Sequence, residues 1–165
     1  MRIAVQVEPD ADSAPDVEYR WDADTDILSA RLSAAPTDGT PGSLEVAGED
    51  GSWLILDLSA GRINGVEVAV WPDVRHRPTL EPPTSSEVGR AVVRAAMPSG
   101  QVPALELNTA VHAESDPAQR TIHFKLGDAR RTRTYRLGRD LLLDLDAQSR
   151  LAGVWLLNVP PCPDA

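Results

Sequence analysis

The sequence predicts a mainly β fold in which two tandem antiparallel β-meander repeats pack as a pseudo-dimer, with one helix between them. Three observations support this: an internal repeat, a series of short apolar runs in both halves, and one helical pattern in a Pro-rich linker. We divide the chain into a first β repeat (residues 1–72), the linker with its helix (73–102) and a second β repeat (103–165). A repeat of about 60 residues buries too little apolar surface to be comfortably stable alone. We therefore expect one joint core, with two independent small domains as the alternative.

The internal repeat is clearest where residues 53–68 align with residues 141–156. Leu-Asp-Leu lies over Leu-Asp-Leu, and Arg-Ile-x-Gly-Val lies over Arg-Leu-x-Gly-Val, with one extra turn residue in the second copy. Upstream, residues 22–32 lie over residues 116–126 without a gap, although only an Asp and a final basic-Leu pair match clearly. Two matches in the same order and with similar spacing indicate a tandem repeat.

Apolar runs of strand length follow one another in both halves, separated by turn residues. The expected strands are Val17–Trp21, Ile27–Leu32, Leu44–Ala47, Trp53–Leu58 and Ile63–Val70 in the first half, and Thr121–Leu126, Thr132–Leu137, Leu141–Leu145 and Leu151–Asn158 in the second. Ile3, Val5 and Val7 alternate at the start of the chain, as Leu105 and Leu107 do before the second copy. These two stretches are candidates for equivalent leading strands.

The linker predicts irregular chain followed by one helix. The prolines between Pro72 and Pro83 argue against regular sheet or helix there. Residues 84–87, Thr-Ser-Ser-Glu, then form a capping box, with a hydroxyl first and a carboxylate three residues later. Apolar side chains recur at helical spacing at Val88, Ala91, Val92, Ala95 and Ala96. This pattern predicts an amphipathic helix around residues 85–97.

Composition and charge exclude several classes of protein. The formal net charge of −9 argues against a nucleic-acid or anionic-membrane partner, because both attract clustered cations. Residues 1–72 contain 14 acidic and 4 basic side chains, whereas residues 101–165 contain 8 of each, so the acidity belongs to the first half. Cys162 is the only cysteine, which excludes an internal disulfide and a multi-cysteine metal site. With no signal peptide and no run of about 20 apolar residues, we expect a cytoplasmic protein without a cofactor.

The carboxylates of the first hairpin resemble the opening of a calcium loop. Asp22, Asp24 and Asp26 have the right spacing, but such a loop also needs a glycine at its sixth position and a glutamate at its twelfth. Ile27 and Ser33 occupy these positions. We therefore expect no metal here, and a hairpin turn in which the Asp side chains bind local backbone N–H groups.

Two further carboxylates occupy the same place in both copies. Asp57 and Asp144 each lie inside an apolar strand, so a pseudo-two-fold arrangement would give paired carboxylates suited to acid–base chemistry. The alternative is that each faces solvent or accepts backbone hydrogen bonds at the following turn. The three histidines are scattered, and His123 lies between Ile122 and Phe124 so that it points away from their face. No nucleophile or metal-ligand motif accompanies these residues, so we assign no catalytic residue and do not expect an enzyme.

The most unusual stretch is the basic run at residues 130–136, Arg-Arg-Thr-Arg-Thr-Tyr-Arg. In a strand, Arg131, Arg133 and Tyr135 share one face. Three interpretations compete. The run is a charged edge strand that blocks aggregation, or it pairs with the acidic segment around 16–26 within the chain or across a homodimer, or it recognises an acidic partner.

The first copy also has an ordered set of residues that matches a known family. An aromatic residue and two aspartates precede a strand at Trp21, Asp22 and Asp26, an apolar-Leu-Asp run ends at Asp57, and Gly-Arg-Ile-x-Gly-Val-Glu-Val occupies residues 61–68. These residues resemble domain of unknown function 2283, a bacterial family of small proteins, in both residue order and spacing.

The second copy departs from that family pattern at two positions. Arg120 replaces the second aspartate and Trp155 replaces the glutamate. If those carboxylates have a function, the second copy has lost it. Members of the family are usually single units, so the tandem resembles a fused dimer. The resemblance implies no established activity, and it associates some members loosely with toxin–antitoxin-like gene pairs.

Three functions follow as hypotheses. The leading one is a non-catalytic protein-interaction module, antitoxin- or immunity-like, that binds another protein or a second copy of itself. Its candidate contacts are Arg131, Arg133, Tyr135 and the three aspartates of the first hairpin. The second is a small-ligand-binding β protein with a pocket lined by Trp53, Trp71 or Trp155. The third is an enzyme that uses Asp57 or Asp144, which predicts a shifted carboxylate in a cleft.

Overall fold

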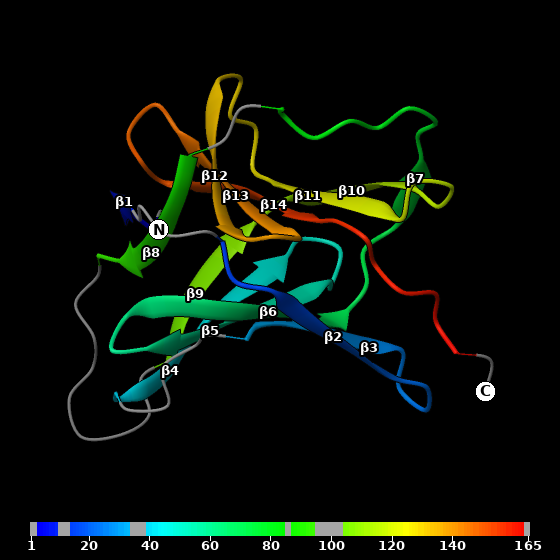
Figure 1. Cartoon of the computed structure of the whole chain (residues 1–165), viewed down its shortest axis with the longest axis horizontal. Coiled ribbons are helices and arrows are strands. Elements are labelled where there is room, and N and C mark those ends of the chain that lie inside the picture. The colour runs from blue at the N-terminus through cyan, green and yellow to red at the C-terminus, as the bar shows by residue number, and fades with distance from the viewer. Residues whose placement is uncertain (1–2, 10–13, 34–38, 85–86, 95–103, 164–165) are drawn as a thin grey trace.

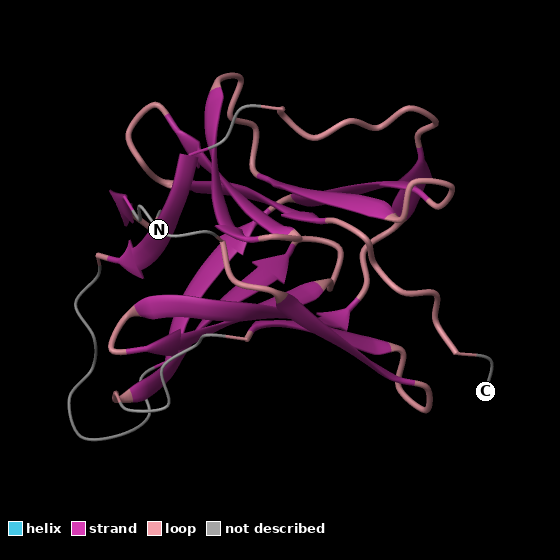
Figure 2. Ribbon diagram, viewed as in Figure 1, coloured by secondary structure: helices cyan, strands magenta, loops and turns pink. Residues whose placement is uncertain are grey.

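The computed structural model describes residues 3–9, 14–33, 39–84, 87–94 and 104–163. All regular structure in these residues is β, and Figure 2 shows strands joined by loops, without a helix in the described part of the chain. The strands up to residue 93 are β1 (Val5–Pro9), β2 (Val17–Asp22), β3 (Ile27–Leu32), β4 (Pro41–Gly48), β5 (Trp53–Ser59), β6 (Arg62–Val70), β7 (Val74–His76) and β8 (Glu87–Val93). The later strands are β9 (Ala104–Thr109), β10 (Val111–Asp116), β11 (Thr121–Leu126), β12 (Thr132–Gly138), β13 (Leu141–Asp146) and β14 (Leu151–Leu156).

The mainly β prediction is confirmed, and the expected strands lie close to their predicted bounds. β3 and β11 begin and end where the apolar pattern predicted, at Ile27–Leu32 and Thr121–Leu126. The turn before each of them ends in a residue with positive φ, Asp26 at 59° and Arg120 at 52°. This left-handed conformation is the one that tight hairpin turns use. Local alternation and turn chemistry were therefore sufficient to place these strands.

Each half contains five antiparallel strands in the same order. The order is β2-β3-β6-β5-β4 in the first half and β10-β11-β14-β13-β12 in the second. Parallel strands extend both sheets, with β9 beside β4 and β7 beside β10. β8 lies between the halves, parallel to β12 and joined to β6 through Arg62 and Val92, and β1 pairs antiparallel with β8. Figure 1 shows the two halves as two layers that face each other.

Residues 87–93 form β8, so the helix expected around residues 85–97 is wrong over this stretch; residues 85–86 and 95–97 lie outside the described residues. Burial alternates along β8, with Gly89, Ala91 and Val93 buried, which is the pattern of a strand. Gly89 also disfavours a helix interior, and a Cβ there would lie 2.5 Å from the side chain of Val7. Hydrogen bonds to strands on both sides therefore outweigh a local helical spacing.

The Pro-rich segment also contains regular structure, contrary to the prediction for Pro72 to Pro83. Between its prolines, β7 pairs in parallel with residues 113–115 of β10, a strand that the sequence pattern did not indicate. Three consecutive residues without proline keep the backbone N–H groups that this pairing needs. Further along, Leu80 is buried against Leu142 and Trp155. The linker therefore covers part of the outer face of the second sheet.

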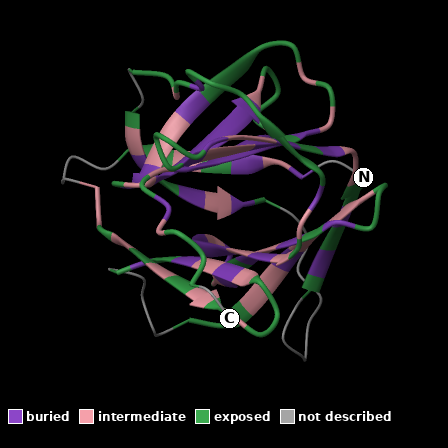
Figure 3. Ribbon diagram, turned by 90° about the vertical axis from the view of Figure 1, so that its right-hand side faces the viewer, coloured by how far each residue is buried: buried purple, intermediate pink, exposed green. Residues whose placement is uncertain are grey.

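One continuous apolar core lies between the two layers. Figure 3 shows buried residues in the strands of both layers, and the core cluster includes Leu56 of the first half and Leu143 of the second. Aromatic rings continue this contact. The ring of Trp71 stacks on Trp21 at 5.7 Å between centroids and lies 5.9 Å from Phe124. Fully buried apolar side chains from both halves therefore belong to one core.

The tail after β14 runs beside β2. The hydroxyl of Tyr19 donates to the carbonyl oxygen of Leu157 at 2.6 Å, and Nε1 of Trp21 donates to the carbonyl oxygen of Pro160 at 2.8 Å. Burial raises the pKa of Tyr19 above its usual range, so its hydroxyl remains a donor. Within the described residues, no helix is long and apolar enough to cross a membrane.

Candidate functional site

The outer face of the second sheet contains a buried carboxylate with three hydrogen-bond donors. Asp144 of β13 is 4% exposed. Its Oδ2 lies 2.8 Å from Nε2 of His123, its Oδ1 accepts from the hydroxyl of Thr134 at 2.6 Å, and Nε1 of Trp155 lies 3.2 Å from Oδ2 and 3.3 Å from Oδ1. Because a carboxylate only accepts, all three neighbours donate to Asp144.

The ring of His123 is held in one orientation. Its centroid lies 3.8 Å from that of Trp155, and the two ring planes differ by 10°. Trp155 in turn packs against Leu80 and Leu142. Because Nε2 donates to Asp144, the Nδ1 atom of His123 remains for another partner, and it has none among the described residues.

The contact between His123 and Asp144 depends on a glycine. Their strands, β11 and β13, are separated by β14, and Gly153 of β14 lies opposite Asp144. A Cβ at Gly153 would lie 2.5 Å from Oδ2 of Asp144 and 2.9 Å from the carbonyl oxygen of Phe124. The hydrogen bond therefore passes over β14 at a position that has no side chain.

A pocket of about 280 Å³ lies in front of this group. Besides His123 and Asp144, its charged or titratable lining consists of Arg77, His112, Glu114, Lys125 and Arg130. Nη1 of Arg77 lies 2.8 Å from Oε2 of Glu114 and offsets that charge. Lys125 and Arg130 are exposed and form no ion pair within the part of the chain that the structure describes. The pocket therefore has an excess of positive charge.

The first half differs at the equivalent positions. Asp57 of β5 and Arg31 of β3 lie opposite the same glycine, Gly65, from its two sides. Asp57 is exposed, although partial burial raises its pKa and Arg31 acts in the opposite direction. The hydrogen-bond partners of Asp144 all come from the second half, so the two aspartates do not form a carboxylate pair.

Asp57→Asn is expected to raise the melting temperature slightly at about pH 7. Burial raises the folded-state pKa of Asp57 above its value in the unfolded chain, so above the folded pKa the ionised carboxylate destabilises the native state. Asparagine removes this effect, and the gain disappears below the unfolded pKa, where Asp57 is protonated in both states. Because solvent screens the charge at this exposed site, the gain in the free energy of unfolding stays below about 1 kcal/mol. Thermal melts of both proteins at about pH 3 and about pH 7 measure it, and an equal difference at both values would contradict it.

The His123 network could not be predicted from the sequence, because it depends on the pairing register of β11, β14 and β13. Ser29 lies opposite Glu67 in the first sheet, and at the equivalent places His123 lies opposite Trp155 in the second. The two halves therefore differ at one pair of facing positions on adjacent strands. In the sequence His123 and Trp155 are 32 positions apart and show no common motif.

The outer face of the first sheet combines carboxylates with exposed apolar side chains. A row in register across β9, β4, β5 and β6 consists of Glu106, Glu45, Ile55 and Glu67. On the same sheet Trp53 is 38% exposed, and Val70 directly opposite is 46% exposed. We call these six residues the acidic face. It offers a large aromatic side chain with negative charge around it.

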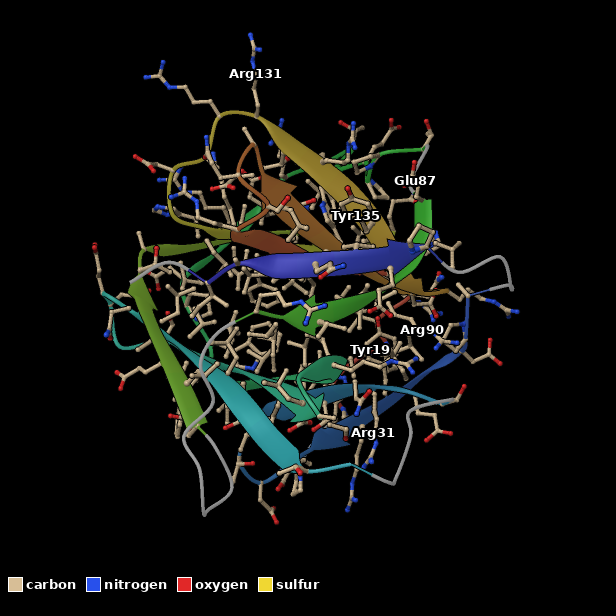
Figure 4. All side chains as sticks on the ribbon, turned by 90° about the vertical axis from the view of Figure 1, so that its left-hand side faces the viewer. Tyr19, Arg31, Glu87, Arg90, Arg131 and Tyr135 are labelled. Atoms are coloured by element: carbon tan, nitrogen blue, oxygen red, sulfur yellow. The ribbon has the colours of Figure 1, made fainter. Side chains whose placement is uncertain are left out.

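The three predicted contacts of the basic strand line one hollow of about 360 Å³. Arg131 lies in the turn before β12 and projects away from the molecule, and Arg133 is exposed, whereas Tyr135 is half-buried against the core (Figure 4). Tyr135 lies opposite Glu87 of β8, which places the ring between strands at the edge of the core. The three side chains differ in exposure but lie together at one face of β12, where a hydrogen bond with Tyr135 raises the pKa of the Arg133 guanidinium. Their role in binding a partner stays a prediction.

Two interpretations of this basic strand can be compared with the structure. β12 lies between β13 and β8, and among the described residues β8 pairs with Tyr135 and Arg136 of β12. The ion pair that joins Asp16 to this region is made with Arg139, at 3.3 Å, and both side chains are exposed. The acidic segment therefore contacts the turn after β12 within the chain.

Asp22 ends β2, and Asp24 and Asp26 lie in the exposed turn between β2 and β3. Oδ1 of Asp22 accepts from the backbone N–H of Asp24 at 3.0 Å, as expected of a hairpin turn stabilised by its own side chains. In the described ranges, no group of three or more His, Cys, Asp or Glu residues is arranged to hold a metal ion.

The three tryptophans proposed for a ligand pocket lie in three places. Trp53 belongs to the acidic face. Nε1 of Trp71 donates to the carbonyl oxygen of Asp26 at 2.7 Å, and Trp155 is buried beside His123. The structure does not bring them together around a common cavity.

No model of a known protein family matches this chain, and no curated protein matches it.

Proposed function

We propose that this chain is a non-catalytic protein-interaction module, antitoxin- or immunity-like, whose acidic face binds a basic partner protein in the bacterial cytoplasm. The observation that supports this most is the exposed Trp53, with Val70 opposite and three glutamates on the same sheet face. Aromatic anchors in the centre of a patch with a charged rim are typical of binding hot spots. Singly exposed apolar residues are ordinary, but here they lie next to each other.

Charge defines the chemistry of the proposed partner. Glu45 and Glu106 are neighbours in register, and Glu67 follows across Ile55. Like charges side by side destabilise a sheet, so this row is better explained by a cationic partner than by stability. The acidity of the first half would also speed the encounter with such a partner.

We also infer that the two halves are diverged copies of one unit packed as a pseudo-dimer, as a fused pair of the family that the first copy resembles. Their identical strand order and the positive φ at Asp26 and Arg120 in equivalent turns support this. In this interpretation only the first copy keeps the acidic face. Arg136 and Trp155 of the second copy occupy the places of Glu45 and Glu67, as their cross-strand partners indicate.

The proposal is tested by purifying the partner and measuring its affinity directly. A tagged chain is used to isolate a stoichiometric protein from the native host, and that protein is then titrated by calorimetry. We expect Trp53→Ala and Glu67→Lys each to weaken binding at least tenfold, because they remove the aromatic anchor and reverse a facing charge. Binding should also weaken as salt is added.

Asp128→Lys is the matched control, because it makes the same kind of charge change at an exposed residue of the second half. It should leave the affinity within about twofold. The proposal is wrong if no stoichiometric protein is recovered, or if a recovered partner binds the two acidic-face variants as tightly as it binds the unchanged chain.

A further inference from the structure

We propose that the pocket in front of His123 binds the oxyanion of a small phosphorylated or carboxylated molecule, with a proton on Nδ1 of His123 as one of its contacts. This site is on the outer face of the second sheet and is independent of the acidic face. The inference comes from three features: a histidine of fixed orientation, two unpaired cations beside it, and a cavity large enough for a small molecule.

His123 lines the pocket, and its Nδ1 atom is the ring nitrogen that Asp144 does not bind. Asp144 accepts from Nε2 at 2.8 Å, so protonation of the ring places the second N–H on Nδ1. The same carboxylate is held by Thr134 at 2.6 Å and by Trp155, and it is 4% exposed. A buried carboxylate is costly unless it is hydrogen-bonded, and Asp144 accepts from three side chains, one of which is His123.

The cations that would meet the anion come from the sheet and from one loop. Lys125 follows His123 by two residues on β11 and therefore lies on the same face. Arg130 comes from the loop before β12, and both side chains line the 280 Å³ cavity with His123. An oxyanion in this cavity would meet a lysine, an arginine and the imidazolium, and charge-assisted hydrogen bonds of this kind are the strong ones.

The charged and titratable groups around His123 determine the net charge of the pocket. These are Asp144 from β13, Glu114 and His112 from β10, Lys125 from β11, Arg77 after β7 and Arg130 from the loop; the neighbours on β14 are Gly153 and the uncharged Trp155. Glu114 is directly opposite His123, and Arg77 offsets it at 2.8 Å. An anion would therefore enter a site whose remaining excess charge is positive.

Nuclear magnetic resonance of the histidine rings tests the inference. Sulfate is the probe for a phosphoryl group and acetate the probe for a carboxylate, since both stay fully ionised between about pH 6 and about pH 8. We expect a saturable shift of the His123 resonances with at least one of them, because the ring lines the cavity with Lys125 and Arg130. His76 lies outside the cavity lining and serves as an internal reference. Whichever anion saturates first identifies the ligand class.

Lys125→Ala and Arg130→Ala should each weaken the binding by roughly three- to tenfold, as expected for partly exposed charged contacts. Arg133→Ala removes the same charge from an exposed residue outside the cavity and should have less than twofold effect. In His123→Asn, followed through the amides of residues 125 and 130, binding should also weaken, because the imidazole contact is lost. The inference is overturned if neither anion gives a saturable shift at His123, or if Arg133→Ala weakens binding as much as Lys125→Ala.

Discussion

Replacing Phe124 with alanine is expected to lower the free energy of unfolding by about 3–5 kcal/mol, the usual range for removing a buried aromatic ring. Phe124 is 0% exposed, and its ring lies 5.9 Å from Trp71, which stacks on Trp21 of the first half. The cavity would therefore open where the two halves meet. Urea unfolding followed by tryptophan fluorescence and by circular dichroism should show one coincident transition at lower denaturant concentration.

Val70→Ala is the control for the loss of an apolar side chain at the surface. Val70 is 46% exposed, so its truncation should change stability by less than about 0.5 kcal/mol. Two separate transitions, of which Phe124→Ala moves only the one belonging to the second half, would mean that the halves unfold independently. That result would contradict the expectation that the shared core makes the two halves unfold together.

Asp144→Ala is expected to destabilise the protein by about 3 kcal/mol. The substitution leaves Thr134, His123 and Trp155 without their common acceptor in a buried place, and groups left unpaired in this way cost more than the hydrogen bonds contribute. Asp144→Asn should cost less, because the amide oxygen still accepts. Free energies of unfolding from urea titration measure both effects.

Asp57→Ala provides the matched comparison, since Asp57 occupies the equivalent position of the first sheet and faces solvent. It should cost less than about 0.5 kcal/mol or add slightly to stability. A second comparison is His123→Ala in the Asp144→Ala background, which should cost less than His123→Ala alone because the two residues share one hydrogen bond. Equal costs for Asp144→Ala and Asp57→Ala would show that the buried network is not a source of stability.

Most of the strands could be predicted because their signals are local. Ile27–Leu32 and Thr121–Leu126 alternate with period two and follow tight turns, and these properties depend on a few neighbouring residues. The stretch at Glu87–Val93 shows the limit of such reasoning. Its apolar spacing suits a helix, but its strand neighbours β1, β12 and β6 come from distant parts of the chain. Tertiary hydrogen bonds decide the conformation where local preference is weak.

The candidate sites also differ in whether the sequence alone could predict them. Turn chemistry at Asp22 was predictable, because a side chain that binds the backbone two residues later needs no distant partner. The group around His123 was not, because Asp144 reaches the histidine across an intervening strand, at a glycine whose position depends on the pairing register. The acidic face likewise needs β9 to lie beside β4, which no periodicity in residues 104–109 indicates.

By itself, the sequence determined that the chain is mainly β, where most strands begin and end, and that its acidity is concentrated in the first half. Alternation, turn residues and net charge are properties of neighbouring residues or simple sums, so they can be read without coordinates. Only the tertiary structure decided that residues 87–93 form a strand and that β7 and β9 extend opposite halves. It also decided that Asp144 is buried beneath His123 while Asp57 remains at the surface. These outcomes depend on which strands become neighbours and in what register. Both are determined by burying the apolar faces of all the strands in one core.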